Sequence, residues 1–247
     1  MNGVLLVTGG GRGIGAAVAT LAAKHGFDVA VNYLQDERAA SAIVEAVRSN
    51  GVRALAIKAD VALEADVVRM FEAVDTFGQL KALVNNAGVT GGFARVADLK
   101  AAALERMLAV NVTGAILCAR EAVRRLSTVW GGAGGSIVNV SSLAARLGGA
   151  GEWVHYAASK GAIQTFTVGL AREVAGEGVR VNAVAAGIVD TEMHLAAGDP
   201  HRAKRIGATV PVGRAATAHE IAEAILWLTS PAASYVTGTI LEAGGGR

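Results

Sequence analysis

The chain has 247 residues, of which 52% are hydrophobic and 18% are charged, and its formal net charge is +2. This length suits one sizeable core and is short for two, so we expect a single domain over residues 1–247. Because the charge is nearly balanced and no lysine- and arginine-rich run is interleaved with aromatic residues, we expect no nucleic-acid partner.

Short apolar runs alternate along the chain with longer, alanine-rich segments of helical period. This alternation predicts βαβ units, and continuous apolar runs such as LLV, ALV and SIV suit parallel strands covered on both faces. We expect an α/β fold of the Rossmann type, a doubly wound parallel sheet with helices on both faces. The seven predicted strands are residues 4–7, 29–32, 54–57, 82–85, 136–141, 179–184 and 239–242, and the predicted helices are residues 13–25, 37–50, 65–77, 99–126, 156–175 and 219–228.

Two other segments have no strong period. Residues 131–135 are glycine-rich and lie between a helix and a strand, which indicates a connection within the domain. Residues 190–210 have a loose pattern interrupted by Gly198, Asp199 and Pro200, and we expect them to form a substrate lid.

The sequence TGGGRGIG, residues 8–15, follows the first strand and opens the first helix. Glycines let a chain turn tightly there, bring backbone N–H groups close to a pyrophosphate and point a helix N-terminus at it. A plain strand-to-helix turn is the alternative, but the position in a first βαβ unit favours a dinucleotide. The expected contacts come from Gly9, Gly11, Arg12, Gly13 and Ile14.

Tyr156 and Lys160 lie four residues apart in a segment of helical period, so their side chains share one helix face. A nearby cation lowers the pKa of a phenol, which can then donate a proton to a carbonyl oxygen or accept one from an alcohol. A solvated tyrosine and lysine would be the alternative if the pair stood alone. Ser141 and Ser142 end a predicted strand, where a hydroxyl can hold a substrate oxygen or simply form a turn.

Together these residues resemble the short-chain dehydrogenase/reductase family over essentially the whole chain. TGGGRGIG is similar to the family's TGxxxGxG loop, residues 85–88 to its NNAG and residues 156–160 to its YxxxK. The wording around Tyr156 and at the end of the chain resembles a bacterial oxidoreductase branch with sugar-dehydrogenase-like and 3-oxoacyl-carrier-protein reductase-like members. Ala186 stands where the family usually has proline, and the spacing from Ser142 to Tyr156 is one residue longer than in its commonest members.

The resemblance implies roles for further residues. Ser142, chosen over Ser141, would form the catalytic set with Tyr156 and Lys160, and Asn111 would join it by helping to hold a water near Lys160. Lys160 and Tyr156 would also contact the cofactor, and Lys160 would hold the nicotinamide ribose. The remaining cofactor contacts implied by the resemblance are Asp60, Val61, Asn86, Ala87, Gly88, Gly187, Ile188, Thr191 and Met193.

The end of the second strand bears on the choice of cofactor, NADP(H) or NAD(H). NAD-preferring Rossmann folds place a carboxylate there for the ribose 2′-hydroxyl. Here Asn32, which can donate its amide to a phosphate oxygen, and Tyr33, which can add a hydroxyl, stand at that point. Arg12 supplies a guanidinium that suits a 2′-phosphate. We therefore predict a preference for NADP(H) over NAD(H); the alternative is that Arg12 points to solvent and Asp36 or Glu37 meets the ribose.

Several residues near these motifs have weaker signals. His155 is expected at the rim of the site, because neighbouring helix residues point in different directions. Glu152 and Trp153 precede the predicted catalytic helix and could line a substrate pocket or only pack. Met193, His194 and Leu195 fall in the expected lid, and the five histidines have no metal-ligand spacing, so no metal is predicted.

The sequence therefore predicts an NADP(H)-dependent oxidoreductase acting on a small carbonyl or alcohol. A 3-oxoacyl-carrier-protein reductase is the enzymatic alternative, with Arg95, Arg124 and Arg146 as candidates for a basic docking patch. A redox-sensing NADP(H)-binding regulator is the non-enzymatic one. The resemblance implies a homotetramer in which the long fourth and fifth helices pair between subunits and the C-terminal strand region forms another two-fold contact. The lone Cys118 suggests a buried thiol, and we expect a cytoplasmic protein without a membrane segment, because no leader or long uncharged apolar stretch is seen.

Overall fold

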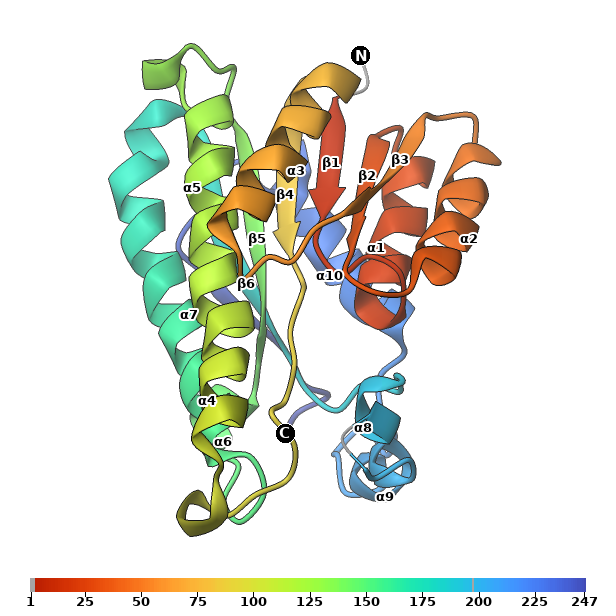
Figure 1. Ribbon diagram of the computed structural model, residues 1–247, viewed down its shortest axis with the longest axis vertical. Helices are drawn as coiled ribbons and strands as arrows, with labels where there is room; N and C mark the ends of the chain where they lie inside the picture. Colours follow the sequence, from red (N-terminus) through yellow and green to blue (C-terminus); the bar gives the residue numbers. More distant parts are fainter. Residues whose placement is uncertain (1–2, 197) are drawn as a thin grey trace.

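A seven-stranded, entirely parallel sheet forms the centre of the computed structural model, which describes residues 3–196 and 198–247 (Figure 1). The strand order is β3-β2-β1-β4-β5-β6-β7, so the predicted Rossmann-type fold is confirmed. Each strand runs about as the sequence predicts, with β2 to β6 extended by one or two residues and β7 shifted by one. The strands are β1 Val4–Val7, β2 Asp28–Tyr33, β3 Ala54–Lys58, β4 Leu80–Asn85, β5 Gly135–Ser142, β6 Val179–Ala186 and β7 Ile240–Ala243.

Alternate residues of the strands supply two separate cores, one on each face of the sheet. Leu5 and Val7 of β1 face a core covered by α1 (Gly13–Lys24), α2 (Glu37–Arg48) and α10 (Ala218–Thr229). Val4 and Leu6 face the other core, covered by α3 (Glu64–Phe77), α5 (Ala115–Leu126) and α7 (Val154–Val174). Cys118 is buried in this second core, as expected. Because both faces are covered, the central strands read as unbroken apolar runs.

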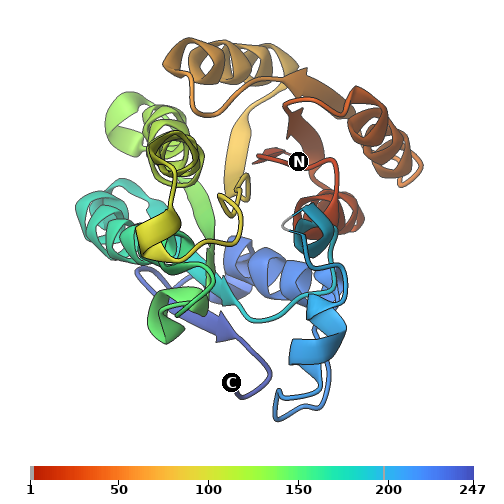
Figure 2. The same cartoon turned by 60° about the horizontal axis from the view of Figure 1, so that its bottom comes forward.

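The carboxyl ends of all the strands meet at one edge of the sheet, at the bottom in Figure 1. The chain leaves β1 toward β2 on one side and returns beside β1 as β4, which creates a switch point between these two strands. Ligands of doubly wound sheets bind outside such a switch point. The helices α8 (Met193–Ala196) and α9 (Arg202–Gly207) lie at the same edge, and Figure 2 shows α8 beside the start of α1.

The segment predicted as one helix over residues 99–126 consists of helical pieces of different types. A 3₁₀ turn η1 (Val96–Asp98) precedes α4 (Ala101–Leu108), and a π-helical segment η2 (Ala109–Gly114) joins α4 to α5. Gly114 packs so closely on the neighbouring loop that an added Cβ would lie 2.7 Å from the Val61 carbonyl oxygen. The run Ala101–Leu126 is long and apolar enough, with a mean hydropathy of 1.4, to cross a membrane; in this fold it forms part of one helical layer.

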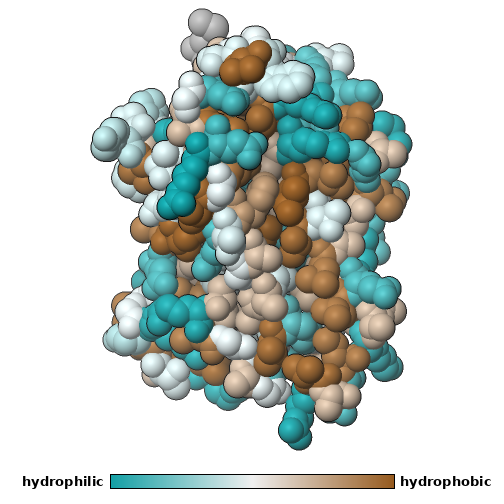
Figure 3. Space-filling model, turned by 90° about the vertical axis from the view of Figure 1, so that its left-hand side faces the viewer, coloured by the Kyte–Doolittle hydropathy of each residue, from teal (hydrophilic) through white to brown (hydrophobic). Residues whose placement is uncertain are grey.

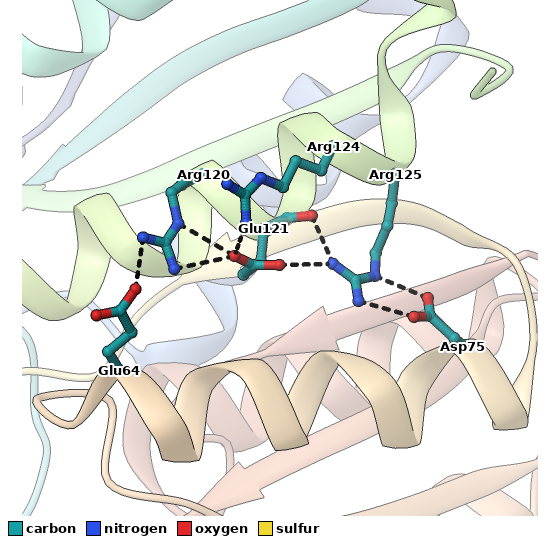
Figure 4. A network of polar contacts seen from close by, with 6 residues as sticks. All are labelled: Glu64, Asp75, Arg120, Glu121, Arg124 and Arg125. Atoms are coloured by element: carbon teal, nitrogen blue, oxygen red, sulfur yellow. Dashed lines mark hydrogen bonds and ion pairs between the residues drawn. The ribbon is translucent and has the colours of Figure 1, made fainter. Parts of the chain in front are cut away.

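A network of charged residues fixes α5 against α3 (Figure 4). Glu121 is buried and accepts hydrogen bonds from Arg120, Arg124 and Arg125. Arg125 continues to Asp75 on α3 with two bonds of 2.7 Å, and Arg120 continues to Glu64 at 2.8 Å. Burial alone would raise the pKa of Glu121, but the three arginines outweigh it and hold that pKa below its usual value. The network therefore keeps a carboxylate charged at the interface of the two helices.

The remaining segments are short. They are the 3₁₀ turns η3 (Thr128–Trp130), η4 (Ala175–Glu177) and η5 (Pro231–Ala233) and the four-residue helix α6 (Ala144–Leu147). Residues 190–210, predicted to be irregular, contain the short α8 and α9 on either side of Ala197, which lies outside the described residues. A bridge between Val189 and Ala216 closes the base of this segment.

Candidate active site

One cavity of about 900 Å³ runs along the carboxyl edge of the sheet, from the glycine loop to the start of α7. It brings together nearly every residue that the sequence singles out. Among the predicted catalytic and cofactor-binding residues, Asn111 is the exception and does not line the cavity. The predicted residues that line the cavity are Gly9, Gly11, Arg12, Gly13, Ile14, Asn32, Tyr33, Asp60, Val61, Asn86, Ala87, Gly88, Ser142, Tyr156, Lys160, Gly187, Ile188, Thr191 and Met193.

The glycine loop needs its glycines for conformation and for space. Gly9 and Gly13 have φ angles of 62° and 54°, in the left-handed region that favours glycine. A Cβ on Gly15 would lie 2.4 Å from the Gly9 carbonyl oxygen. Helix α1 begins at Gly13, and its first-turn N–H groups have no partner within the helix, so they can face an anion in the cavity.

Two polar side chains hold the glycine loop on the end of β4. The Thr8 hydroxyl accepts hydrogen bonds from the backbone amides of Asn86 and Ala87, both at 3.0 Å. The Asn86 side chain donates in return to the carbonyls of Thr8 at 2.9 Å and Gly9 at 3.0 Å. The NNAG residues thus brace the loop as well as line the cavity, a structural role that the motif alone does not reveal.

Asn32 does not have the role that the sequence predicts for it. Its amide nitrogen donates to the carbonyls of Ala59 at 3.0 Å and Ile57 at 3.3 Å, and its oxygen accepts from the Gly9 amide at 3.2 Å. The amide is therefore committed to the backbone of β3 and the glycine loop, and a donation to a phosphate is wrong for this conformation. Tyr33 lines the cavity, as does Asp36, whose carboxylate caps α2 by accepting from the Ala39 amide at 2.9 Å.

The structure distinguishes the two candidate serines. A hydrogen bond joins the hydroxyls of Ser142 and Tyr156, and Ser142 also accepts from the Ala144 amide at 3.1 Å. Ser141 is buried, and its hydroxyl donates to the Lys160 carbonyl at 3.2 Å and accepts from Gln164. Both serines line the cavity, and Ser142, the one chosen from the sequence, is the one whose hydroxyl meets the phenol.

Lys160 and Tyr156 share a face of α7, as their spacing predicts, and both are buried. The Lys160 Nζ lies 5.7 Å from the centre of the Tyr156 ring and donates to the Val140 carbonyl at 2.7 Å. Burial raises the pKa of Tyr156 to about 12, with the Ser142 hydrogen bond acting in the opposite direction. Burial lowers the pKa of Lys160 to about 8. A lowered phenol pKa is therefore wrong for the chain in this state, because burial is the dominant effect.

Asn111 lies on the π-helical segment and connects two parts of the site. Its oxygen accepts from the Val89 amide at 2.9 Å, and its nitrogen donates to the Val89 carbonyl at 2.9 Å and the Ser159 hydroxyl at 3.1 Å. A Cβ on Gly88 would lie 3.4 Å from the Asn111 oxygen and 3.6 Å from Lys160 Nζ. The Asn111 oxygen and the Lys160 ammonium therefore both lie next to Gly88.

The sequence predicts His155 at the rim of the site, but the structure buries this residue. A Cβ on Gly91 would lie 3.2 Å from its ring, so the imidazole packs under the loop that follows β4. The helix direction explains the error, because α7 turns its His155 face toward another packed element and not toward water.

The sequence gives no signal for several residues that line or support the cavity. Arg106 of α4 pairs with Asp60 at 2.8 Å, across the loop after β3. Arg202 of α9 pairs with Glu152 at 2.6 Å, and Phe93 stacks on Trp153 with 4.7 Å between ring centres. Each contact joins positions far apart in the chain, which local periodicity cannot reveal. Of the lid histidine and its neighbours, Met193 lines the cavity, and the side chain of His194 lies outside the described residues.

Comparison with known proteins agrees with this geometry. A family model described as enoyl-(acyl carrier protein) reductase matches residues 9–247. The chain is 49% identical over 245 residues to the protein named uncharacterized oxidoreductase YgfF from Escherichia coli (strain K12), covering 99% of each chain. A short-chain dehydrogenase from Burkholderia cenocepacia J2315, solved with NADP, superposes with a TM-score of 0.90 at 34% identity and covers 99% of this chain and 97% of its own.

The chain belongs to the short-chain dehydrogenase/reductase family. A 3-ketoacyl-(acyl-carrier-protein) reductase from Brucella melitensis, solved with NADH, also superposes with a TM-score of 0.90 at 31% identity, over 99% of this chain and 98% of that one. The relatives are oxidoreductases, and this chain is one as well. Solved members of the family bind either nicotinamide dinucleotide.

The cavity fits such a cofactor. Glycines leave backbone amides open at the start of α1, and Arg12 supplies a cation at the same end. The opposite end holds the buried phenol and ammonium of Tyr156 and Lys160. In between, Asn86 and Ala87 at the end of β4 line the switch point where dinucleotides bind in such folds.

The buried ammonium leads to a prediction about stability. The pKa of Lys160 falls from its ordinary value of 10.5 to about 8 on folding. Below pH 8 the buried charge therefore lowers the free energy of unfolding, and this cost disappears as the pH rises from 8 to 10.5. We expect Lys160→Met to stabilise the cofactor-free protein at pH 6.5 by about 2 kcal/mol, after the lost hydrogen bond to Val140 is allowed for. The gain in melting temperature over the parent should shrink at pH 10, with the exposed Lys24→Met as control. A gain that is absent at pH 6.5, or larger at pH 10, would contradict this account.

Proposed function

We propose that the protein is an NADP(H)-dependent oxidoreductase that interconverts a ketone or aldehyde and an alcohol, with Tyr156 as its acid/base. The observation that carries the proposal is the arrangement of Tyr156. The phenol is buried, is hydrogen-bonded to the Ser142 hydroxyl and has the Lys160 ammonium over its ring. It lines the same cavity as the glycine loop. This arrangement places a proton donor, an oxygen-holding hydroxyl and a cation within one small volume.

The residues divide the chemistry among them. A bound nicotinamide cofactor supplies the hydride in reduction and accepts it in oxidation. Ser142 hydrogen-bonds the substrate oxygen and holds it against Tyr156, whose hydroxyl donates a proton to that oxygen as the carbonyl becomes an alcohol. Lys160 stabilises the resulting phenolate by its positive charge, which offsets the cost of ionising a buried phenol. Asn111 supports Lys160 by helping to hold a water.

The proposed cofactor preference is NADP(H) over NAD(H), and Arg12 is its main support. Arg12 is exposed, lines the cavity at the glycine loop, and makes no ion pair with another described residue. Its guanidinium is free to meet a 2′-phosphate, and Tyr33 is close enough along the wall to add a hydroxyl. Asp36 is the nearest alternative for a ribose contact, because its carboxylate reaches the same cavity.

The proposed substrate is a small molecule and not a carrier-bound acyl chain. The candidate docking arginines do not form one free patch. Arg146 of α6 pairs with Glu242, whereas Arg124 belongs to the Glu121 network near the end of α5 that lies farthest from the cavity (Figure 1). A carrier protein would need unpaired positive charge gathered at the cavity mouth. The catalytic arrangement likewise favours an enzyme over a redox-sensing regulator, since a sensor has no use for a proton donor.

We further propose a cytoplasmic homotetramer in which α5 and α7 pair with their copies. The face of these helices shown in Figure 3 carries many hydrophobic residues along its middle, with polar residues among them. Leu108, Val112 and Ile116 form a partly exposed apolar stripe at helical spacing along α4, η2 and α5. On α7 the outward positions include Ala158, Ala162 and Gly169, whose small side chains permit close packing of symmetric helices. This pairing would cover the apolar surface of the helical run Ala101–Leu126.

Replacing the phenol tests the acid/base role. We expect Tyr156→Phe to lower kcat by about 10²- to 10⁴-fold, because the ring still packs while its proton is lost. NADPH affinity, measured by fluorescence titration, should change by less than about threefold, because most cofactor contacts lie elsewhere along the cavity. A variant that keeps more than about a tenth of the parent kcat would remove Tyr156 from this role.

The cofactor preference is tested by removing one guanidinium. Arg12→Ala should lower the ratio of kcat/KM for NADPH to that for NADH by about tenfold, the value of one charge-assisted hydrogen bond. Lys24→Ala, at the other end of α1, is the matched control and should leave the ratio unchanged. A parent that uses NADH as well as NADPH, or a ratio unaffected by Arg12→Ala, would assign the ribose to Asp36 instead.

Oligomeric state is tested by light scattering at micromolar concentration. The parent should have four times the chain mass of 25.0 kDa, and Ile116→Glu should reduce it by placing a charge in the helix pairing. Val129→Glu, an exposed position on η3 beyond α5, should leave the mass unchanged. A monomeric parent would refute the proposed assembly.

A further inference from the structure

Three segments that are distant in the sequence meet at the end of the cavity opposite the glycine loop. They are the loop after β4, the turn before α7 and the start of the lid helix α9. Their contact is made by four side chains, Phe93, Glu152, Trp153 and Arg202, which we call the Arg202 clasp. Glu152, Trp153 and Arg202 line the cavity itself, so the clasp forms part of the wall that a substrate meets.

The polar half of the clasp is a two-pronged ion pair. Arg202 Nη1 donates to Glu152 Oε1 at 2.9 Å, and Nη2 lies 2.6 Å from Oε2. The Arg202 side chain is only 11% exposed, so water competes weakly for these bonds. The Glu152 backbone carbonyl also accepts from the Ala94 amide at 3.1 Å, which ties the loop after β4 to the same point.

The aromatic half of the clasp uses the flat face of the same guanidinium. The Phe93 and Trp153 rings are stacked, with centres 4.7 Å apart and planes 14° from parallel. The Arg202 guanidinium carbon lies 4.4 Å from the Trp153 ring centre and 5.5 Å from that of Phe93. A planar, always charged group is needed to stack and pair at once, which a lysine does not offer.

The clasp reaches the proposed catalytic residue through Trp153. The indole packs edge-on against Tyr156, with ring centres 5.8 Å apart and planes at 62°. Trp153 also precedes α7, and its carbonyl accepts from the Ala157 amide at 2.9 Å. A shift of the indole would therefore change both the wall beside the phenol and the start of the helix that carries it.

We propose that Arg202 is a positioning residue that determines substrate size. Through the clasp it holds α9 against the Glu152–Trp153 turn and keeps the indole beside Tyr156. The enclosed end, which also presents Leu147 and Ile206, then accepts ketones with a compact apolar group and rejects those with a bulky one. The inference rests on the proposed function, because it assumes that Tyr156 acts on a carbonyl in this cavity.

The first measurement is independent of catalysis. Hydrogen exchange in the whole, NADPH-loaded protein should become at least tenfold faster over residues 198–210 in Arg202→Ala. Arg205→Ala is the matched control, because it removes an exposed arginine of the same helix whose ion-pair partner, Asp199, lies within residues 190–210. Arg202→Met keeps an apolar side chain at this position and serves as the second variant should Arg202→Ala fail to fold. Glu152→Gln should also make the amides of residues 198–210 exchange faster. Exchange that is equal in Arg202→Ala and Arg205→Ala would overturn the proposal.

The second measurement separates size selection from general damage. With NADPH in excess, kcat and KM are compared for cyclohexanone and 4-phenylcyclohexanone in the parent, Arg202→Ala, Arg202→Met and Arg205→Ala. We expect both Arg202 variants to raise KM for cyclohexanone about tenfold, to change kcat by less than about threefold, and to shift the kcat/KM ratio at least tenfold toward the phenyl ketone.

The outcomes distinguish the clasp from the proposed function. Faster lid exchange with an unchanged ketone ratio would overturn the size-selecting role of Arg202. An equal fall in kcat for both ketones would likewise overturn it, since that indicates damage to the reacting groups. A parent inactive on both ketones counts against the proposed substrate class, and the exchange result alone then decides whether Arg202 holds the lid.

Discussion

Lys160 keeps an ammonium group inside the fold, with the Val140 carbonyl in place of water. That one arrangement constrains much of the molecule. Strand β5 must end where its carbonyl can point at α7, and α7 must pack closely enough on β5 to bury the side chain. Gly88 packs beside the same group, because a Cβ built on it would lie 3.6 Å from the ammonium nitrogen. The burial lowers the pKa of Lys160 to about 8, so the fold carries a cost that its proposed chemistry makes useful.

The two ends of the cavity are built in different ways. At the glycine loop, the side chains of Thr8, Asn32 and Asn86 form hydrogen bonds with backbone groups at the ends of neighbouring strands. The loop is therefore fixed by the carboxyl ends of β1 to β4. Such a surface is formed before any ligand arrives and suits a cofactor that is common to the whole family. The substrate end depends instead on side chains from a loop, a turn and the lid, joined at Arg202. Under the proposed function, substitutions there alter the choice of substrate and leave the sheet undisturbed.

Two carboxylates of the fold are held charged by arginines that pair with them. Glu121 is surrounded by three arginines between α3 and α5, and Glu152 by the fork of Arg202. Both carboxylates have lowered pKa values. Burial is the largest single effect on Glu121 and raises its pKa, but the three arginines together outweigh it, and the pKa of Glu152 is lowered chiefly by the Arg202 hydrogen bond. The Glu121 network joins the helices α3 and α5, whereas the pair of Arg202 and Glu152 joins α9 to the turn before α7. The same physical device thus serves rigidity in one place and closure in the other.

The sequence by itself determined the fold and the composition of the site. Its alternation of apolar runs and helical segments gave the parallel sheet, and the glycine loop, NNAG and YxxxK motifs marked residues that nearly all line one cavity. These features are local, because periodicity, turns and the spacing of Tyr156 and Lys160 are written in neighbouring residues. The tertiary structure decided what those residues touch. It committed Asn32 to backbone carbonyls, buried His155, raised the pKa of Tyr156 and joined Arg202 to Glu152 across fifty positions of sequence. Burial and long-range pairing depend on which surfaces the packed elements bring together, and a chain read residue by residue does not contain that information in local form.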